Sequence, residues 1–149
     1  MCIRDRLKAG GTHIKAENAL ECVFGYGVAL DMTRRDLQGV AKKAGRPWEV
    51  GKAFDRSAPC TPLVAAAGIG HPAEGAIWLD VNGERRQEGN LNQLIWSVPE
   101  QIEYLSCLFE LRPGDLILTG TPAGVAACKR GDKMVGHVDG LPELHVTVV

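Results

Sequence analysis

The dipeptide Asn82-Gly83 lies between two runs, "AIWLDV" and "ERRQEG", in which apolar and polar residues tend to alternate. Asn and Gly both tolerate the positive φ angles that a tight two-residue hairpin turn requires. The sequence therefore predicts an antiparallel hairpin over residues 76–89. Strands and helices do not alternate regularly along the chain, which disfavours a doubly wound or barrel fold built on a parallel sheet.

Further strands are predicted wherever an apolar run is bounded by glycine or by a turn dipeptide. Strands are expected at residues 23–30, 116–122, 133–138 and 144–149. Helical spacing of apolar residues predicts one short helix from residue 14 and a second over 98–109, and a third helix is expected over 33–44. The fold class is therefore mainly β with a few helices (α+β), in one domain.

Two of these helices begin with a residue pattern that is typical of a capping box. Thr33 stands three residues before Asp36, and Ser97 stands three residues before Glu100. In each pair, the hydroxyl and the carboxylate can cap the helix start reciprocally. We therefore expect helices to begin just after Thr33 and Ser97.

The charge balance and the cysteines limit the partners and the compartment. The 17 basic and 18 acidic residues nearly cancel, and no basic block is present that would follow a phosphate backbone. No apolar run approaches the roughly 18 residues needed to span a bilayer. The five cysteines form a scattered, odd-numbered set without a Cys-x-x-Cys pair, which favours free thiols in a reducing compartment. We expect a cytoplasmic protein that binds neither nucleic acid nor membrane.

Several polar residues near the ends of strands could carry chemistry, and each has an ordinary structural alternative. Asp31 follows the strand over 23–30 and could bind a metal, or it could cap a helix. Lys52 could face a ligand or only solvent. Arg34 and Arg35 would point about 100° apart on a helix, so at most one is expected to face a ligand. Thr121, in a Gly-Thr-Pro turn, could contact a ligand or be exposed.

The four histidines show no pairing with one another or with carboxylates at a spacing that metal ligands use. We expect His13, His71 and His145 in loops or on the surface, and His137 on a strand beside a turn. The cysteines have no neighbouring basic context that would favour a thiolate, so covalent catalysis is not predicted.

Four segments resemble the fumarylacetoacetate hydrolase family, and they occur in the order found in that family. They are "GYGVALDMTRRDLQ", "GKAFDRSAPC", "VNGERRQEGNLNQLIWSVPEQIEYLS" and "LRPGDLILTGTPAGV". The resemblance extends over residues 7–149. Within the family, "MTRRDLQ" and "GRPWEVGKAFDRSAP" look most like the acylpyruvate hydrolase branch, whose members cleave fumarylpyruvate in gentisate breakdown.

The resemblance implies a mixed β-roll fold and a homodimeric Mg²⁺-dependent hydrolase, with Mn²⁺ or Ca²⁺ as alternative cations. The substrate would be a small 2,4-dioxo acid, cleaved at a carbon–carbon bond, as in the conversion of fumarylpyruvate to fumarate and pyruvate. Asp31 matches a metal ligand of the family, and Lys52 matches the catalytic lysine beside the metal. Arg35, Gln38 and Thr121 match positions that bind the substrate.

The first six residues, "MCIRDR", depart from the family pattern. Family members carry a Glu-x-Glu metal-binding pair on the strand before residue 7, and the second glutamate would fall near Cys2 and the first before Met1. A His-Glu pair farther upstream, the expected activator of water, has no counterpart. We therefore predict non-family residues at 1–6 and a partial catalytic domain over 7–149.

Three alternatives remain open at this point. Residues 1–6 could be an ordinary frayed terminus. The chain could be an inactive fragment with a dimerisation or structural role, or a related oxo-acid decarboxylase or isomerase. If the preceding family strand is missing, the strand over 23–30 should have an unpaired edge and favour self-association.

Overall fold

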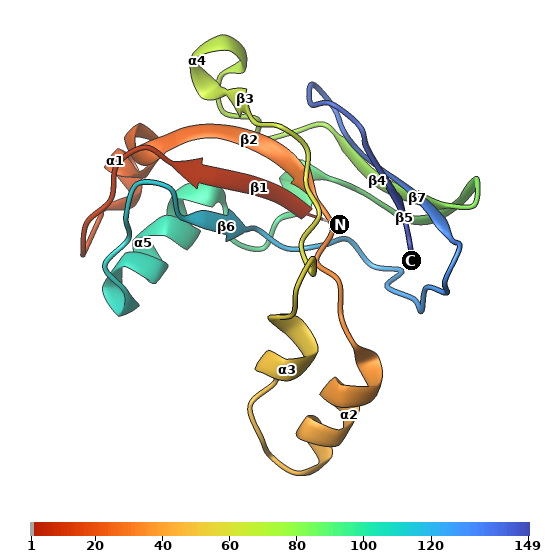
Figure 1. The fold of residues 1–149 in the computed structure, drawn as a ribbon. Coiled ribbons are helices and arrows are strands. Elements are labelled where there is room, and N and C mark those ends of the chain that lie inside the picture. Colours follow the sequence, from red (N-terminus) through yellow and green to blue (C-terminus); the bar gives the residue numbers. More distant parts are fainter. Residues whose placement is uncertain (1) are drawn as a thin grey trace.

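The computed structural model describes the backbone of residues 2–149 and the side chains of residues 5–149. Two four-stranded antiparallel sheets form its framework (Figure 1). In the order of pairing, the first sheet contains β3 (Val64–Ala65), β2 (Val23–Ala29), β1 (Cys2–Leu7) and β6 (Leu116–Leu118). The second contains β5 (Glu84–Asn90), β4 (Ala76–Val81), β7 (Lys133–Val138) and β8 (Leu144–Thr147). The predicted α+β fold class, mainly β, is confirmed.

The hairpin predicted from Asn82-Gly83 is present. β4 and β5 pair antiparallel on either side of the turn, and Asn82 and Gly83 have φ angles of 54° and 83°. The register shifts between Leu79 and Asp80, as a bulge would cause. The turn dipeptide was a reliable predictor because few residues other than Asn and Gly adopt two consecutive positive φ angles.

Strand β1 corrects one expectation drawn from the sequence. The strand over 23–30 was expected to have an unpaired edge, but β2 lies between β3 and β1, and β1 in turn pairs with β6. Backbone groups form these ladders, so even the charged segment Cys2–Leu7 can supply a strand. Met1 and the side chain of Cys2, which the family comparison singled out, lie outside the described residues, and the boundary at residue 6 stays a prediction.

Within residues 2–149, the helices longer than one turn are α2 (Arg35–Lys43) and α5 (Val98–Leu108). The shorter ones are α1 (Ala16–Ala19), α3 (Glu49–Lys52) and α4 (Ala66–Ile69), with 3₁₀ turns at Leu20–Cys22 and Leu91–Gln93. The Glu100 carboxylate accepts the Ser97 backbone N–H at 2.7 Å, so the capping box of α5 is confirmed. The short helix predicted from residue 14 begins at Ala16 and continues as the 3₁₀ turn to Cys22.

The capping prediction for α2 is wrong. Its N-cap is Arg34, and no side chain caps the helix start. The Thr33 hydroxyl instead accepts a hydrogen bond from Lys52 Nζ at 2.9 Å. A tertiary partner has therefore replaced the local one, which the sequence spacing alone cannot distinguish.

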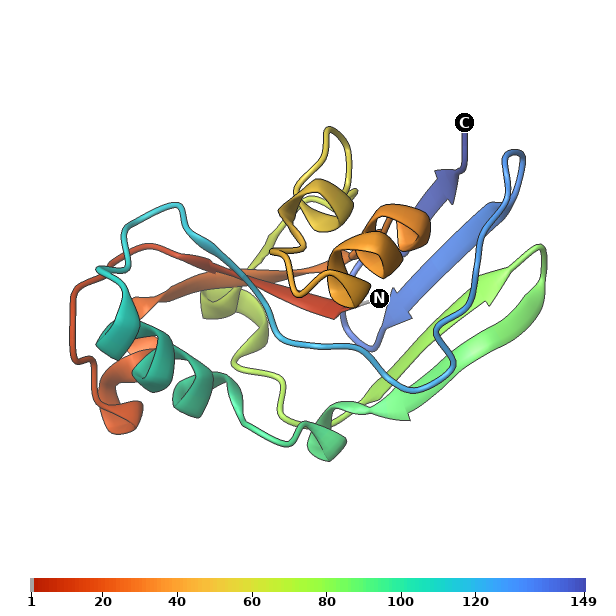
Figure 2. The same ribbon diagram turned by 90° about the horizontal axis from the view of Figure 1, so that it is seen from below.

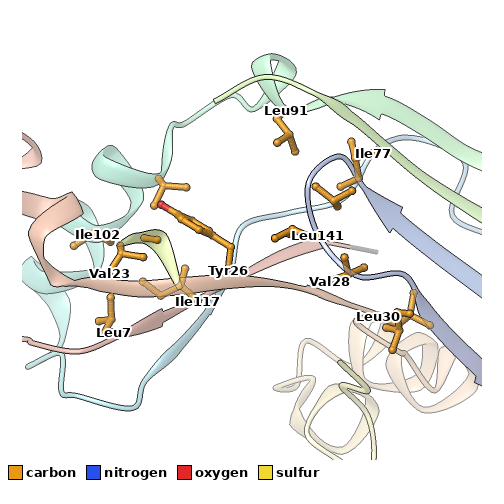
Figure 3. Packing of buried hydrophobic residues seen from close by; sticks show 14 of the residues in the cluster. Leu7, Val23, Tyr26, Val28, Leu30, Ile77, Leu91, Ile102, Ile117 and Leu141 are labelled. Atoms are coloured by element: carbon orange, nitrogen blue, oxygen red, sulfur yellow. The ribbon is translucent and has the colours of Figure 1, made fainter. Parts of the chain in front are cut away.

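One hydrophobic cluster joins both sheets and α5 (Figure 3). Tyr26 and Val28 from β2 are fully buried, and Ile77 from β4 and Ile102 from α5 belong to the same cluster. Val138 of β7 is also fully buried. The alternating burial of β4 and β7 provides the apolar side chains of the second sheet.

Asp5 is the exception in this core. Its side chain is fully buried on β1, opposite Tyr26 on β2 and Ile117 on β6. Neither carboxylate oxygen has a hydrogen-bond partner among the described residues. Burial disfavours the charged form and raises the pKa of Asp5 from 3.8 to about 7.

Helices α2 and α3 lie outside the two sheets. They form an excursion of the chain between β2 and β3 that projects from the first sheet (Figure 1). Its two ends are joined by backbone hydrogen bonds from Leu30 N–H to Pro59 C=O and from Met32 N–H to Ser57 C=O, at 3.0 and 2.8 Å. The excursion is thus anchored where it leaves and rejoins the sheet. In residues 2–149, no helix has the length and apolar character needed to cross a bilayer.

Candidate active site

A cavity of about 1090 Å³ extends from the α2–α3 excursion to the second sheet and to the loop after β6. Figure 2 shows α2 and α3 next to each other in this excursion. The five residues predicted to form a site all line the cavity, although they come from three separate segments: Asp31, Arg35, Gln38, Lys52 and Thr121. The structure places the five side chains together, and the catalytic or binding role of each one stays a prediction.

Lys52 occupies a cage of three oxygen atoms at the end of α3. Its Nζ donates to Asp31 Oδ1 at 2.5 Å and to Thr33 Oγ1 at 2.9 Å, and approaches the Met32 carbonyl oxygen at 3.5 Å. The alternative of a lysine that faces only solvent is therefore wrong. About a third of the Lys52 side chain is still exposed, at 32%, so a molecule in the cavity can reach the ammonium group.

The two adjacent arginines both line the cavity, which differs from the expectation that at most one would face it. Arg34 is the extended N-cap residue of α2, so the helical separation of about 100° does not apply to the pair. The Arg34 guanidinium lies 4.3 Å from the centroid of the Phe54 ring, whereas Arg35 Nη1 approaches Gln38 Oε1 at 3.5 Å. The side-chain contact of Arg35 is weak, because 3.5 Å is long for a hydrogen bond.

Thr121 belongs to a loop that rests on strand β5. The amide nitrogen of Gln87 donates to Thr121 Oγ1 at 2.8 Å and to the Pro122 carbonyl oxygen at 2.6 Å. Gly124 lies against the same strand with a φ of 97°, and a Cβ atom at this position would be 2.1 Å from the Arg86 carbonyl oxygen. Two contacts on consecutive residues of β5 therefore fix the loop in place.

Gly124→Ala is expected to destabilise the fold by about 1–3 kcal/mol more than Gly120→Ala. Both glycines have positive φ, at 97° and 119°, so both substitutions impose backbone strain. At Gly120, however, an added Cβ meets nothing within 4 Å. Urea denaturation of the two variants isolates the cost of the close approach, and equal stabilities would show that the loop does not press on β5.

Sequence reasoning missed two polar residues of this cavity. Thr33 was assigned to a helix cap, and Gln87 was not singled out from the other residues of the hairpin over 76–89. Gln87 is only 4% exposed, although its neighbours Arg86 and Glu88 are exposed. The one available signal was strand alternation, which puts the side chain of Gln87 on the opposite face from those of its two neighbours.

The histidines lie where they were expected, but His137 and His145 have acidic partners that the sequence did not suggest, and His145 Nε2 lies 3.3 Å from Glu143 Oε2. His71 is exposed in a loop and pairs through Nδ1 with the Tyr26 hydroxyl at 2.5 Å. On β7, His137 contacts Glu143 at 3.2 Å and Asp139 at 3.1 Å. The carboxylates come from the turn between β7 and β8, so the fold brings them to the ring.

The described residues do not by themselves fit a divalent cation. In the part of the chain whose side chains are described, no three His, Cys, Asp or Glu side chains are grouped to share a metal ion. Asp31 offers one carboxylate, and Lys52 already occupies one of its oxygens. A hard divalent cation requires about six oxygen ligands. Asp31 alone is therefore an incomplete metal site.

Ammonium, guanidinium, amide and hydroxyl groups gathered around one cavity can bind a small anionic molecule, as in an enzyme site. The fold and sequence agree with one family. The profile of the fumarylacetoacetate (FAA) hydrolase C-terminal family matches residues 6–149, and the chain belongs to this family. The resemblance inferred from the four segments is thus confirmed.

Two of the similar proteins are fumarylpyruvate hydrolases. A fumarylpyruvate hydrolase from a Ralstonia species is 46% identical over 138 residues, which are 93% of this chain and 71% of that protein. The solved structure of fumarylpyruvate hydrolase from Pseudomonas aeruginosa, in complex with Mn²⁺ and pyruvate, matches with a TM-score of 0.97 and 57% identity over 99% of this chain and 64% of that chain.

A relative with a different reaction matches almost as well. An oxaloacetate tautomerase from Escherichia coli is 46% identical over 125 residues, which are 83% of this chain and 57% of that protein. The chain thus spans between 57% and 71% of the length of these three relatives.

Proposed function

We propose that this chain is the larger part of a cytoplasmic, homodimeric hydrolase that cleaves a carbon–carbon bond in a 2,4-dioxo acid. The proposed substrate is fumarylpyruvate, with fumarate and pyruvate as products, in gentisate catabolism. The observation that carries the proposal is the convergence of Lys52, Arg35, Gln38 and Thr121 on one cavity. A neighbour with 57% identity, which binds pyruvate, supports this choice of substrate.

The reaction adds water across the bond that breaks. The hydroxyl of water joins the carbonyl carbon of the acyl half, the carbon–carbon bond breaks, and its electron pair remains on the pyruvate half as an enolate. A proton then converts the enolate to pyruvate. Lys52 is proposed to stabilise the negative charge that develops on the enolate oxygen, because a fixed ammonium group in a partly enclosed cavity favours the charged transition state.

The remaining residues are proposed to hold the substrate. Arg35 would bind a substrate carboxylate, since a planar guanidinium pairs well with two carboxylate oxygens. Gln38 lies next to Arg35 and would orient it through the side-chain contact at 3.5 Å. Thr121 would donate its hydroxyl to the carboxylate of the pyruvate half. These contacts would orient the scissile bond toward Lys52.

A divalent cation is proposed as cofactor, with Mg²⁺ as the first choice and Mn²⁺ or Ca²⁺ as alternatives. Asp31 would be one of its ligands, and the others would have to come from outside the described residues. When bound, such a cation would polarise the two carbonyl groups of the substrate. The Mn²⁺ in the Pseudomonas enzyme supports this part of the proposal.

Tautomerisation of oxaloacetate is the second candidate, which the Escherichia coli relative favours. That reaction moves one proton and requires no attacking water. An inactive fragment with only a dimerisation role is the third candidate, favoured by the single carboxylate at the metal position.

The deciding experiment measures pyruvate release from fumarylpyruvate by the 149-residue chain, with Mg²⁺ and with a chelator. Pyruvate release that the chelator suppresses would support the proposed hydrolase. A parallel assay follows the enol-to-keto conversion of oxaloacetate. Tautomerisation without hydrolysis would favour the second candidate, and inactivity in both assays would favour the third.

A further inference from the structure

Arg56 has a backbone conformation that a bulky side chain disfavours. Its φ angle is 62°, in the left-handed region where glycine and asparagine are common and other residues are rare. Asn82 also lines the cavity with a positive φ, but its hairpin turn explains that angle. Arg56 is the third residue of a turn closed by a hydrogen bond from Ser57 N–H to the Phe54 carbonyl oxygen at 3.0 Å. Positive φ at this position of a turn is ordinarily adopted by glycine.

The turn that contains Arg56 is tied to the base of the α2–α3 excursion. The Ser57 carbonyl oxygen accepts the Met32 N–H at 2.8 Å, and the Pro59 carbonyl oxygen accepts the Leu30 N–H at 3.0 Å. The surrounding backbone therefore imposes the strained conformation on Arg56. Residues that are held in this way cluster at functional sites, so the strain indicates a function for the Arg56 side chain.

The Arg56 guanidinium lines the candidate active site and, among the described residues, has no hydrogen-bond, ion-pair or ring partner. The other three arginines of the cavity lining each have a partner, namely Arg34 over the Phe54 ring, Arg35 near Gln38, and Arg86 beside Glu84. A guanidinium without a partner gives up no contact when an anion arrives. It can also donate two parallel hydrogen bonds to one carboxylate, so Arg56 is suited to bind a carboxylate in the cavity.

We propose that Arg56 determines substrate specificity by binding the carboxylate at the acyl end of the substrate. This inference rests on the proposed function, in which fumarylpyruvate carries one carboxylate on each half. Arg35 and Thr121 would hold the carboxylate of the pyruvate half, and Arg56 would supply a second guanidinium for the other carboxylate. The favoured substrates are therefore acylpyruvates whose acyl group ends in a carboxylate, rather than those whose acyl group ends in a methyl group.

Fumarate and crotonate together test the inference, because they differ only at one end of the molecule. Fumarate has a second carboxylate there, and crotonate has a methyl group. Each is titrated into the 149-residue chain in a buffer that contains Mg²⁺, and binding is followed by the shifts of backbone amide resonances. The unaltered chain is expected to bind fumarate about tenfold more tightly than crotonate. Arg56→Gln should weaken fumarate binding to the level of crotonate and leave crotonate binding unchanged.

Two further variants separate ligand binding from a structural role. Arg56→Gly should weaken fumarate binding as much as Arg56→Gln does, but it should unfold at a higher urea concentration than Arg56→Gln. The reason is that glycine adopts a φ of 62° without the steric cost of a Cβ atom. Arg46→Gln is the matched control, since it removes an exposed guanidinium outside the cavity lining. This variant should bind fumarate as the unaltered chain does.

Pyruvate binding distinguishes a failure of the inference from a failure of the proposed function. If the unaltered chain binds pyruvate but Arg56→Gln binds fumarate as tightly as the unaltered chain, Arg56 does not select the substrate and the proposed function stands. Equal binding of fumarate and crotonate by the unaltered chain would lead to the same conclusion. An Arg56→Gly variant that is no more stable than Arg56→Gln would contradict the strain on which the inference rests. If the unaltered chain binds neither pyruvate nor fumarate, both proposals are wrong.

Discussion

Asp5→Val is expected to raise the free energy of unfolding by about 4 kcal/mol at about pH 8. The Asp5 side chain is fully buried, and its oxygens have no hydrogen-bond partner among the described residues. Burial raises the pKa of this carboxyl from 3.8 to about 7. One pKa unit corresponds to about 1.4 kcal/mol, so ionisation of Asp5 in the folded state costs a large share of the stability of a typical domain.

The direction in which stability changes with pH follows from the protonation of Asp5 in the folded and in the unfolded chain. In the unfolded chain, Asp5 loses its proton near its ordinary value of 3.8, whereas the folded chain retains the proton up to about pH 7. Between these values the folded state binds more protons than the unfolded state, so stability falls as the pH rises. The loss is complete above about pH 7, and it is absent below the unfolded pKa.

Urea denaturation at about pH 5 and about pH 8 measures the effect. Asp5→Asn is the matched variant, because it removes the ionisation but keeps a polar group in the core. It should abolish the pH dependence attributable to Asp5 with a smaller gain in stability than valine gives. Glu74→Gln, at an exposed position, should change neither value. A pH dependence that persists unchanged in both Asp5 variants would show that Asp5 is not the group responsible.

Lys52→Met is expected to lower the rate of the proposed carbon–carbon cleavage by about 10²–10³-fold, the range found when one fixed stabilising group is removed from a charged transition state. The ammonium is held by Asp31 and Thr33, so it is already oriented before substrate arrives. A methionine of similar length retains the packing of the aliphatic chain and removes the charge. The initial rate of pyruvate release from fumarylpyruvate is the measurement.

Loss of the Lys52–Asp31 ion pair should hardly affect folding. Both side chains are about one third exposed, at 32% and 40%, and exposed pairs contribute about 1 kcal/mol or less. Lys43→Met, on the exposed end of α2, is the control and should leave the rate unchanged. If Lys52→Met cleaves fumarylpyruvate at the rate of the unaltered chain, Lys52 has no catalytic role.

The sequence predicted those parts of the fold that depend on local chemistry. The Asn82-Gly83 turn, the strand at Val23–Ala29 and the capping box at Ser97 each depend on a few neighbouring residues, and each is present. The convergence of Asp31 and Lys52 came from the family resemblance and could not come from spacing. Their contact joins residues 21 positions apart and exists only when the α2–α3 excursion folds.

Features that depend on tertiary packing were missed or misread for the same reason. Thr33 has the spacing of a capping residue, but the cation of Lys52 is a stronger partner than a backbone N–H group. The buried state of Gln87 depends on the loop at Thr121, and the burial of Asp5 depends on its neighbours Tyr26 and Ile117. A charged segment gives no sequence signal that it will form a central strand.

The closed base of the α2–α3 excursion has an evolutionary consequence. The segment from Asp31 to Lys52 contains four of the five predicted site residues, and backbone hydrogen bonds at Leu30 and Met32 join the two ends of the excursion. A segment of this kind can be exchanged or altered in length without a shift in strand register. Relatives that differ in chemistry, such as hydrolases and tautomerases, could therefore diverge by replacing this module while their two sheets stay the same.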